Sequence, residues 1–111
     1  MGDYMKLVLS IVSNDDASKV MKALINNRYM VTKLATTGGF LMNGNTTMII
    51  GVDDHQVEDV IEIIKKESST RTKLVPNSSI SDLGLYASVP VEIKVGGSTI
   101  FVIDVEQFIK N

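Results

Sequence analysis

Residues 5–13 read MKLVLSIVS, a run that is rich in Val, Ile and Leu and has no glycine or proline. Apolar residues at consecutive positions are typical of a strand that is covered on both faces. The same character returns in residues 46–52, TTMIIGV, so two strands are expected to be buried on both sides. A single two-layer chain covers only one face of its sheet, and the second face therefore predicts self-association.

A helix is expected after each of these two strands. Asn14, Asp15 and Asp16 supply oxygen atoms that can cap the first helix, and apolar residues then recur at helical spacing. Asp53 or Asp54 is expected to cap the second helix in the same way. The apolar stripes are Ala17, Val20, Met21 and Leu24 in the first helix, and Val57, Val60, Ile61 and Ile64 in the second.

The segments beside these elements predict one strand and two loops. Residues 29–35 are β-branched and aromatic enough for a strand. Residues 36–45 contain three glycines and two threonines, which favours a loop. Residues 68–88 lack apolar periodicity over an unusual length, and we expect them to form one long flexible loop.

Two last strands are expected close to the C-terminus. Residues 91–95 and 99–105 would pair with each other across Gly96 and Gly97, because consecutive glycines tolerate the positive φ of a tight hairpin. The tail, residues 106–111, is expected to add a turn of helix. The resulting order predicts an α+β fold, ferredoxin-like βαββαβ with an extra C-terminal strand.

Composition and charge indicate one domain and exclude several kinds of partner. A chain of 111 residues suffices for one core, so we expect a single domain over residues 5–111, with residues 1–4 an N-terminal extension or a cloning remnant. The net charge of −2 comes from interspersed acids and bases, and this pattern predicts no DNA or RNA partner. The chain has no cysteine and no apolar run of ~20 residues, so a cytoplasmic protein without membrane contact is expected.

The glycine-rich segment also has the chemistry of a site for an anion and a purine. Gly38 and Gly39 leave backbone N–H groups unshielded, and successive N–H groups in a turn can bind phosphate oxygens. Phe40 offers a flat face for stacking a base. Asn45 presents a donor and an acceptor side by side, which suits adenine better than guanine. A glycine turn that simply enters a core strand is the alternative interpretation of the same residues.

The stretch 32–41, TKLATTGGFL, continued by residues 44–47, GNTT, resembles the signature of the cyclic-di-AMP receptors related to PII nitrogen regulators. The resemblance extends over the chain from Met5 and includes VGGSTIFV at residues 95–102. It implies a PII-like homotrimer that binds cyclic-di-AMP in each cleft between subunits, without a catalytic residue, a metal or a further cofactor. It also implies a downstream protein partner, which no motif identifies.

The resemblance further implies roles for single residues near the glycine pair. Thr32 would place its hydroxyl on a base, and Asn45 would recognise adenine. Phe40 and Leu41 would offer backbone N–H groups to phosphate. The candidate ligand-binding residues are Thr32, Gly38, Gly39, Phe40, Leu41, Asn45, Gly51 and Phe101.

Later in the chain, Gly51 would let its strand approach the ligand closely, and Phe101 would press on the second base. An aromatic residue on a closing strand is also a common core residue, which is the alternative for Phe101. Some relatives have an arginine at the position of Met30. Arg28 stands two residues earlier, which is the same side of an extended strand.

Two other functions are alternatives for a sequence of this pattern. A nitrogen-regulatory PII protein binding ATP and 2-oxoglutarate normally carries a long loop after its second strand, whereas residues 36–45 are short. An acylphosphatase needs an arginine in a phosphate loop near its first strand, and residues 13–16, SNDD, contain none. His55 and the acids Glu58, Asp59 and Glu62 are expected on a solvated helix surface, without a metal or catalytic role.

Overall fold

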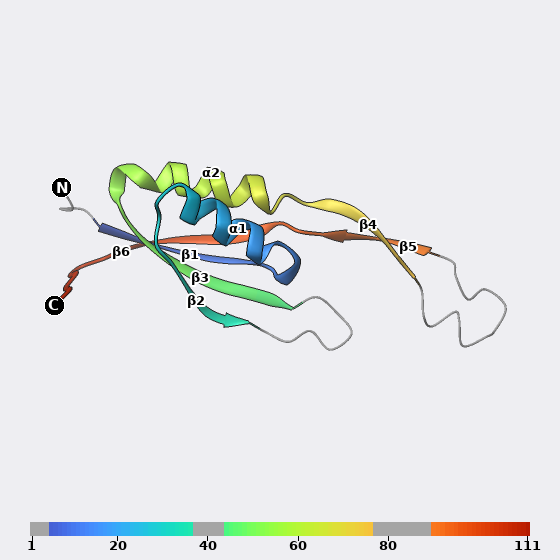
Figure 1. Ribbon diagram of the computed structural model, residues 1–111, viewed down its shortest axis with the longest axis horizontal. Helices are drawn as coiled ribbons and strands as arrows, with labels where there is room; N and C mark the ends of the chain where they lie inside the picture. The colour runs from blue at the N-terminus through green and yellow to red at the C-terminus, as the bar shows by residue number, and fades with distance from the viewer. Residues whose placement is uncertain (1–4, 37–43, 77–89) are drawn as a thin grey trace.

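The computed structural model describes residues 5–36, 44–76 and 90–111, and its main part is a four-stranded antiparallel sheet with two helices on one face (Figure 1). The strands are β1 (Met5–Ser13), β2 (Val31–Thr36), β3 (Asn45–Asp53) and β6 (Ser98–Asp104), in the order β2-β3-β1-β6. The helices are α1 (Asn14–Asn26) and α2 (Val57–Glu67), and the 3₁₀ turn η1 (Asp54–Gln56) precedes α2. The predicted α+β, ferredoxin-like arrangement is confirmed.

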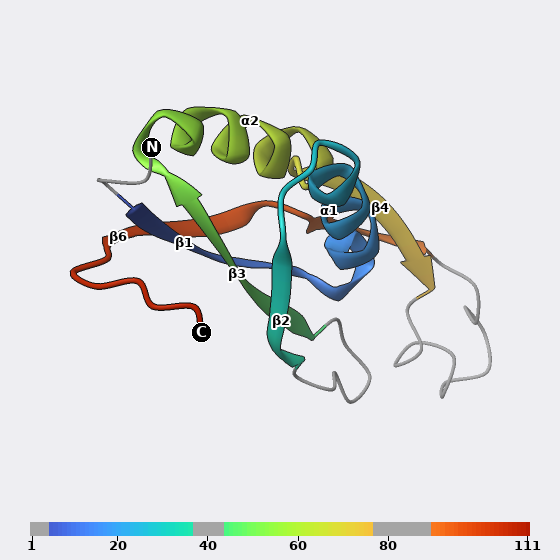
Figure 2. The same cartoon turned by 60° about the vertical axis from the view of Figure 1, so that its left-hand side comes forward.

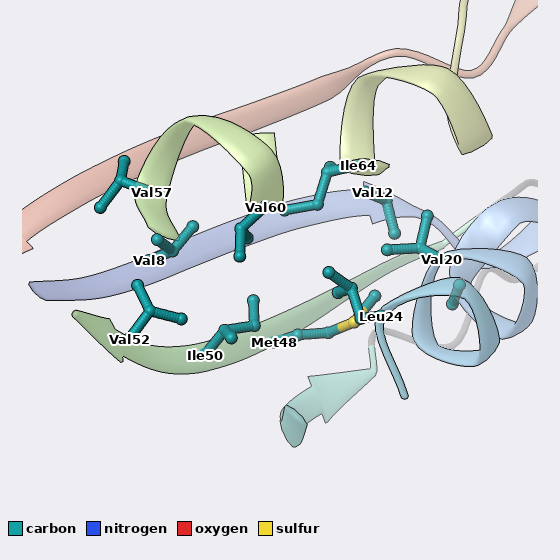
Figure 3. Close-up of a cluster of buried hydrophobic side chains, with 11 residues drawn as sticks. Val8, Val12, Val20, Leu24, Met48, Ile50, Val52, Val57, Val60 and Ile64 are labelled. Atoms are coloured by element: carbon teal, nitrogen blue, oxygen red, sulfur yellow. The ribbon is translucent and has the colours of Figure 1, made fainter. Parts of the chain in front are cut away.

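The core lies between the sheet and the helices (Figure 3). Alternate residues of β1 and β3 face the helices, because successive side chains of a strand point to opposite faces. The helices meet them with the apolar stripes predicted from the sequence. The fully buried apolar side chains of this core are Val8, Val12, Val20, Leu24, Met48, Ile50, Val60 and Ile64.

The opposite face of the sheet carries no helix, as the turned view in Figure 2 shows for the described residues, and we call it the open face. Its β1 and β3 residues are half-buried or exposed in the single chain, although most of them are apolar. The open face includes Thr32 from β2, Asn45, Thr47, Ile49 and Gly51 from β3, Leu7, Leu9 and Ile11 from β1, and Thr99, Phe101 and Ile103 from β6.

Local chemistry sets the ends of α1 and the start of β2. The Ser13 side chain accepts a hydrogen bond from the Asp15 N–H at 3.1 Å, so Ser13 is the N-cap. After Asn26 the chain turns through Arg28, whose φ of 71° belongs to the left-handed region that commonly ends helices. This turn delays the strand that we expected from residue 29 until Val31.

Two further strands, β4 (Arg71–Pro76) and β5 (Pro90–Val95), pair with each other outside the main sheet. We call this two-stranded ribbon the arm; in Figure 1 it extends beyond one end of the sheet. Residues 71–76 were expected within a long loop over 68–88, so that part of the prediction is wrong. Residues 77–88 of that segment lie outside the described residues, and their flexibility stays a prediction.

The predicted hairpin of residues 91–95 with 99–105 is also wrong. β5 pairs with β4. β6 pairs with β1 and is the fourth strand of the main sheet, a place where the expected ferredoxin-like order puts residues 91–95. Gly96 and Gly97 have φ of 92° and 85°, so they do use the left-handed region. They use it to redirect the chain from the arm into the sheet. The tail after β6 has no helical turn.

Two buried serines differ in their hydrogen bonding. Ser68, just past α2, donates from Oγ to the carbonyl oxygen of Ile64 at 2.5 Å. Ser10, on the helix-facing side of β1, has no partner for Oγ among the described residues. A buried hydroxyl without a partner costs free energy, whereas a paired one contributes to stability.

We therefore predict opposite effects for the same substitution at these two sites. Ser68→Ala should lower the free energy of unfolding by about 1 kcal/mol, because it removes a buried hydrogen bond. Ser10→Ala should leave this free energy unchanged or raise it. Urea unfolding followed by circular dichroism measures both, and a larger loss for Ser10→Ala than for Ser68→Ala would contradict the assignment.

Candidate functional site

Four of the eight candidate ligand-binding residues lie within the described residues, and all four are on the open face. Thr32 stands on edge strand β2, Asn45 and Gly51 at the two ends of β3, and Phe101 on edge strand β6. The other four candidates, residues 38–41, lie outside the described residues. A single face of one sheet therefore holds every candidate that the structure describes.

A pocket of about 320 Å³ opens on this face and includes Thr32 and Gly51. Its size falls at the lower end of the range for small-molecule sites. Beside it runs the tail after β6, which contributes an aromatic, an aliphatic and a basic residue. The described residues that line the pocket are Met5, Met30, Thr32, Ile49, Gly51, Phe108, Ile109 and Lys110.

Only Lys110 among these lining residues is charged, and the rest of the lining is apolar or a single hydroxyl. An anionic ligand would meet its compensating charge at Lys110 and a hydrogen-bonding group at Thr32. Its apolar parts would meet Ile49 and the exposed Met30. The combination suits a ligand that has both an anionic group and a flat apolar group.

The structure does not bring Phe101 or Asn45 into this pocket. Thr32, Ile49, Leu9 and Phe101 form one row across the sheet, because their Cα atoms pair in succession. With strands ~4.8 Å apart, Thr32 and Phe101 are about 14 Å from each other. Asn45 stands four residues before Ile49 on β3, which is about 13 Å along the strand.

Phe101 is also more exposed than its alternative interpretation as a core residue requires. Its side chain is 52% exposed, and it stands on the open face rather than among the buried residues. An exposed aromatic side chain on an otherwise apolar face is available to a ligand or to another protein chain. The core interpretation of Phe101 is therefore wrong for the single chain.

Gly51 differs from Gly96 and Gly97 in the space beside it. A Cβ atom at Gly51 would meet only Met5 Cε, at 4.0 Å, which is ordinary contact, and its φ is not in the left-handed region. At Gly96 a Cβ atom would lie 2.4 Å from the Ser69 carbonyl oxygen, and φ is 92°. The chain thus needs a glycine at 96 for its own fold, whereas at 51 the absence of a side chain leaves room in the pocket.

The sequence analysis missed Met5, Ile49 and the three tail residues of the pocket. Ile49 follows from the alternation of β3, since it shares a face with Gly51. The tail gave no such signal, because where an irregular segment lies depends on tertiary contacts. Whether Arg28 replaces the arginine of some relatives was left open by the sequence: it lies in the turn before β2, where strand alternation does not apply, and it is not among the described residues that line the pocket.

Outside the pocket, the α2 acids Glu58, Asp59 and Glu62 are exposed, but one of them also makes a hydrogen bond within the fold. The Tyr29 hydroxyl donates to Asp59 Oδ2 at 2.6 Å and joins the turn after α1 to α2. Burial and this hydrogen bond raise the pKa of Tyr29 to about 12. Asp59 therefore has a structural role that the predicted solvated surface did not include. His55 is exposed in η1, as expected.

Comparisons with known proteins give a family for the chain and a similar solved structure. The family model described as cyclic-di-AMP receptor matches residues 5–111, which include all eight candidate residues. The chain is also similar to a crystal structure described as that of a functionally unknown protein from Pediococcus pentosaceus. That likeness has a TM-score of 0.75 and 39% sequence identity, and it covers 97% of this chain and 98% of that one. No helix in the described part of the chain is long and apolar enough to cross a membrane.

The contrast between the two glycines predicts opposite responses to alanine. Gly51→Ala should raise the free energy of unfolding by about 0.5 to 1 kcal/mol, because alanine loses less backbone freedom in a strand. Gly96→Ala should lower the free energy of unfolding by about 1 to 3 kcal/mol, because alanine is strained at positive φ and its Cβ would clash with the Ser69 carbonyl oxygen. Thermal unfolding followed by circular dichroism checks both. A loss at Gly51 as large as that at Gly96 would show that the space at Gly51 is already filled.

Proposed function

The chain belongs to the cyclic-di-AMP receptor family, and from this premise we propose that it is a cytoplasmic signalling protein that binds cyclic-di-AMP on the open face and catalyses nothing. The family match favours neither a nitrogen-regulatory PII protein nor an enzyme. The observation that carries the proposal is the pocket at Gly51, where a missing side chain leaves room on an apolar face and Lys110 supplies a positive charge.

The chemistry of the ligand matches the residues available on this face. Cyclic-di-AMP has two phosphodiesters and two adenines, so it needs positive charge or N–H donors and flat apolar contacts. Lys110 can compensate one phosphate, and the Thr32 hydroxyl can hydrogen-bond a base edge. We assign Asn45 to the recognition of adenine, and the backbone of residues 38–41 to phosphate.

A homotrimer with the ligand between subunits explains why the candidate residues of one chain stand far apart. Thr32 and Phe101 occupy opposite edges of the sheet, about 14 Å from each other. A neighbouring copy that presents its Phe101 edge to the Thr32 edge would complete one site with residues from two chains. The same contact would cover apolar side chains of the open face, which one chain leaves in water.

Occupancy would pass to an unidentified downstream protein through the segment that begins after α2. We propose that ligand binding orders part of residues 77–88, which follow β4 in the sequence. The arm extends beyond the sheet, where a second protein could contact it.

Binding of cyclic-di-AMP, with cyclic-di-GMP and ATP as controls, tests the proposal by titration calorimetry. We predict saturable binding of cyclic-di-AMP and much weaker binding of both controls. Asn45→Ala should weaken affinity by tenfold to more than a hundredfold, about 1 to 3 kcal/mol, because a desolvated base edge is left unpaired. Gly51→Val should weaken it at least as much by filling the pocket.

The matched control for these variants is Glu58→Gln, on the exposed side of α2, which should bind like the parent protein. Each variant is compared only after its melting temperature and its mass in solution agree with the parent's. ATP binding without cyclic-di-AMP binding would overturn the proposal in favour of the PII alternative. Unchanged affinity in Gly51→Val would remove the pocket from the site.

Sedimentation equilibrium tests the trimer. We predict a mass three times that of the 12.1 kDa chain at micromolar concentration. Ile103→Asp places a charge on the open face and should dissociate the assembly while the helical circular dichroism signal persists. Ile25→Asp, at an exposed apolar residue of α1, should not change the mass. A parent protein of 12.1 kDa would contradict the trimer.

A further inference from the structure

The first turn of α1 contacts two parts of the chain that are distant in sequence. We call residues 13–16 the capping turn, since Ser13 is the N-cap of the helix. One side of this turn holds the beginning of β3, where the candidate residue Asn45 lies. The other side holds the base of the arm. In Figure 1 the start of α1, the start of β3 and the base of the arm are all at the same end of the sheet.

The contact with β3 consists of hydrogen bonds on both sides of Asn45. The Asn14 N–H donates to the Gly44 carbonyl oxygen at 2.9 Å. The buried Thr46 donates from Oγ1 to Asn14 Oδ1 at 2.5 Å. Asn45 itself is paired with Ser13 in the sheet. Movement of Asn45 therefore requires movement of the capping turn.

The contact with the arm is a two-point ion pair to a buried carboxylate. Arg71 donates from Nη2 to Asp16 Oδ1 at 2.8 Å and from Nη1 to Asp16 Oδ2 at 3.1 Å. The Asp16 side chain has no exposed surface, and Lys19 Nζ is 3.6 Å from Oδ1. The hydrogen bonds to Asp16 raise the pKa of Arg71. A buried carboxylate that loses such a partner is strongly unfavourable, so Asp16 fixes the base of β4.

Both strands of the arm are tied to this ion pair. Arg71 Nη1 also donates to the Ser69 carbonyl oxygen at 3.1 Å, and the Gly97 N–H donates to the Ser68 carbonyl oxygen. Gly96 packs against the same atoms, since a Cβ there would lie 2.8 Å from Arg71 Nη1. A shift of Arg71 relative to Asp16 would therefore move β4 and the end of β5 together.

We propose that the capping turn couples the ligand site to the arm, with Asp16 as the positioning residue that transmits occupancy at Asn45. The proposal rests on the function proposed above, because it takes cyclic-di-AMP as the ligand. A base bound to Asn45 fixes the position of the start of β3. The hydrogen bonds of Asn14 with Gly44 and Thr46 then fix the orientation of the capping turn. With the turn held, Asp16 keeps Arg71 and the arm in the docked position.

Coupling of this kind is reciprocal. If ligand binding raises the equilibrium constant for docking of the arm by a given factor, then loss of docking lowers the ligand affinity by the same factor. This factor is typically about fivefold or more. Asp16 therefore affects ligand affinity without touching the ligand. A residue that served only the stability of α1 would change neither the affinity of a folded protein nor the response of the arm.

Hydrogen–deuterium exchange with and without saturating cyclic-di-AMP tests this coupling in the full chain. In the parent, exchange should slow about fivefold or more in peptides covering residues 71–76 and 90–95 as well as in those covering 44–47. In Asp16→Asn the slowing over 44–47 should persist and that in the arm should be lost. Calorimetry should show an affinity about fivefold weaker.

Asp15→Asn is the matched control, since it removes the same charge from the same turn. Asp15 Oδ2 is 3.7 Å from Lys73 Nζ, and both side chains are well exposed, so this pair contributes little. The arm of Asp15→Asn should respond as in the parent. An arm response in Asp16→Asn equal to that of the parent would overturn the proposal.

A second variant changes Arg71, the partner of Asp16 in the arm, and keeps the ion pair between Asp16 and Lys19. Arg71→Gln, at a partly exposed residue, should lose the arm response in the same way even if Asp16→Asn does not fold. A parent-like response in folded Arg71→Gln overturns the coupling. Binding by the parent without any arm response also overturns the coupling alone, whereas absence of binding in calorimetry overturns the proposed function together with it.

Discussion

The sheet has apolar side chains on both faces but helices on only one of them. Alternation along β1 sends Val8 and Val12 into the core and leaves Leu7, Leu9 and Ile11 on the open face. In the single chain the apolar side chains of this second face remain in contact with water, and their burial would be favourable. A ligand and further copies of the chain could both cover this face, and we therefore propose that binding and assembly use the same surface.

The two faces of the sheet also differ in their residues: the face toward the helices forms the core, and the open face holds the described candidate ligand residues. The helix face is packed by β-branched and aliphatic residues, with Ser10 as its one described hydroxyl that lacks a partner. The open face holds all the described candidate residues and the pocket with Lys110. Substitutions on the open face can therefore alter binding while the core stays intact. The capping turn is the exception, because it stands at the edge of the core and contacts both the start of β3 and the arm.

The sequence predicted those parts of the fold that depend on local pattern. The bounds of β1, the two helices and their buried stripes follow from apolar spacing and capping residues. Thr32 and Gly51, which the family resemblance implied as ligand residues, line one pocket in the structure, and their binding role stays a proposal. The arm was missed because residues 71–76, RTKLVP, gain their strand structure from a partner about 20 residues away. Gly96 and Gly97 misled the prediction, since positive φ serves a bend between two sheets as well as a hairpin.

We propose that cyclic-di-AMP binds on the open face beside Gly51. A crystal structure of the protein grown with cyclic-di-AMP tests this placement, because it locates the ligand independently of any substitution. We expect ligand density in contact with Thr32, Ile49 and Gly51, on the side of the sheet away from α1 and α2. Density for the ligand on the helix side of the sheet, or at a site that includes none of these residues, would contradict it.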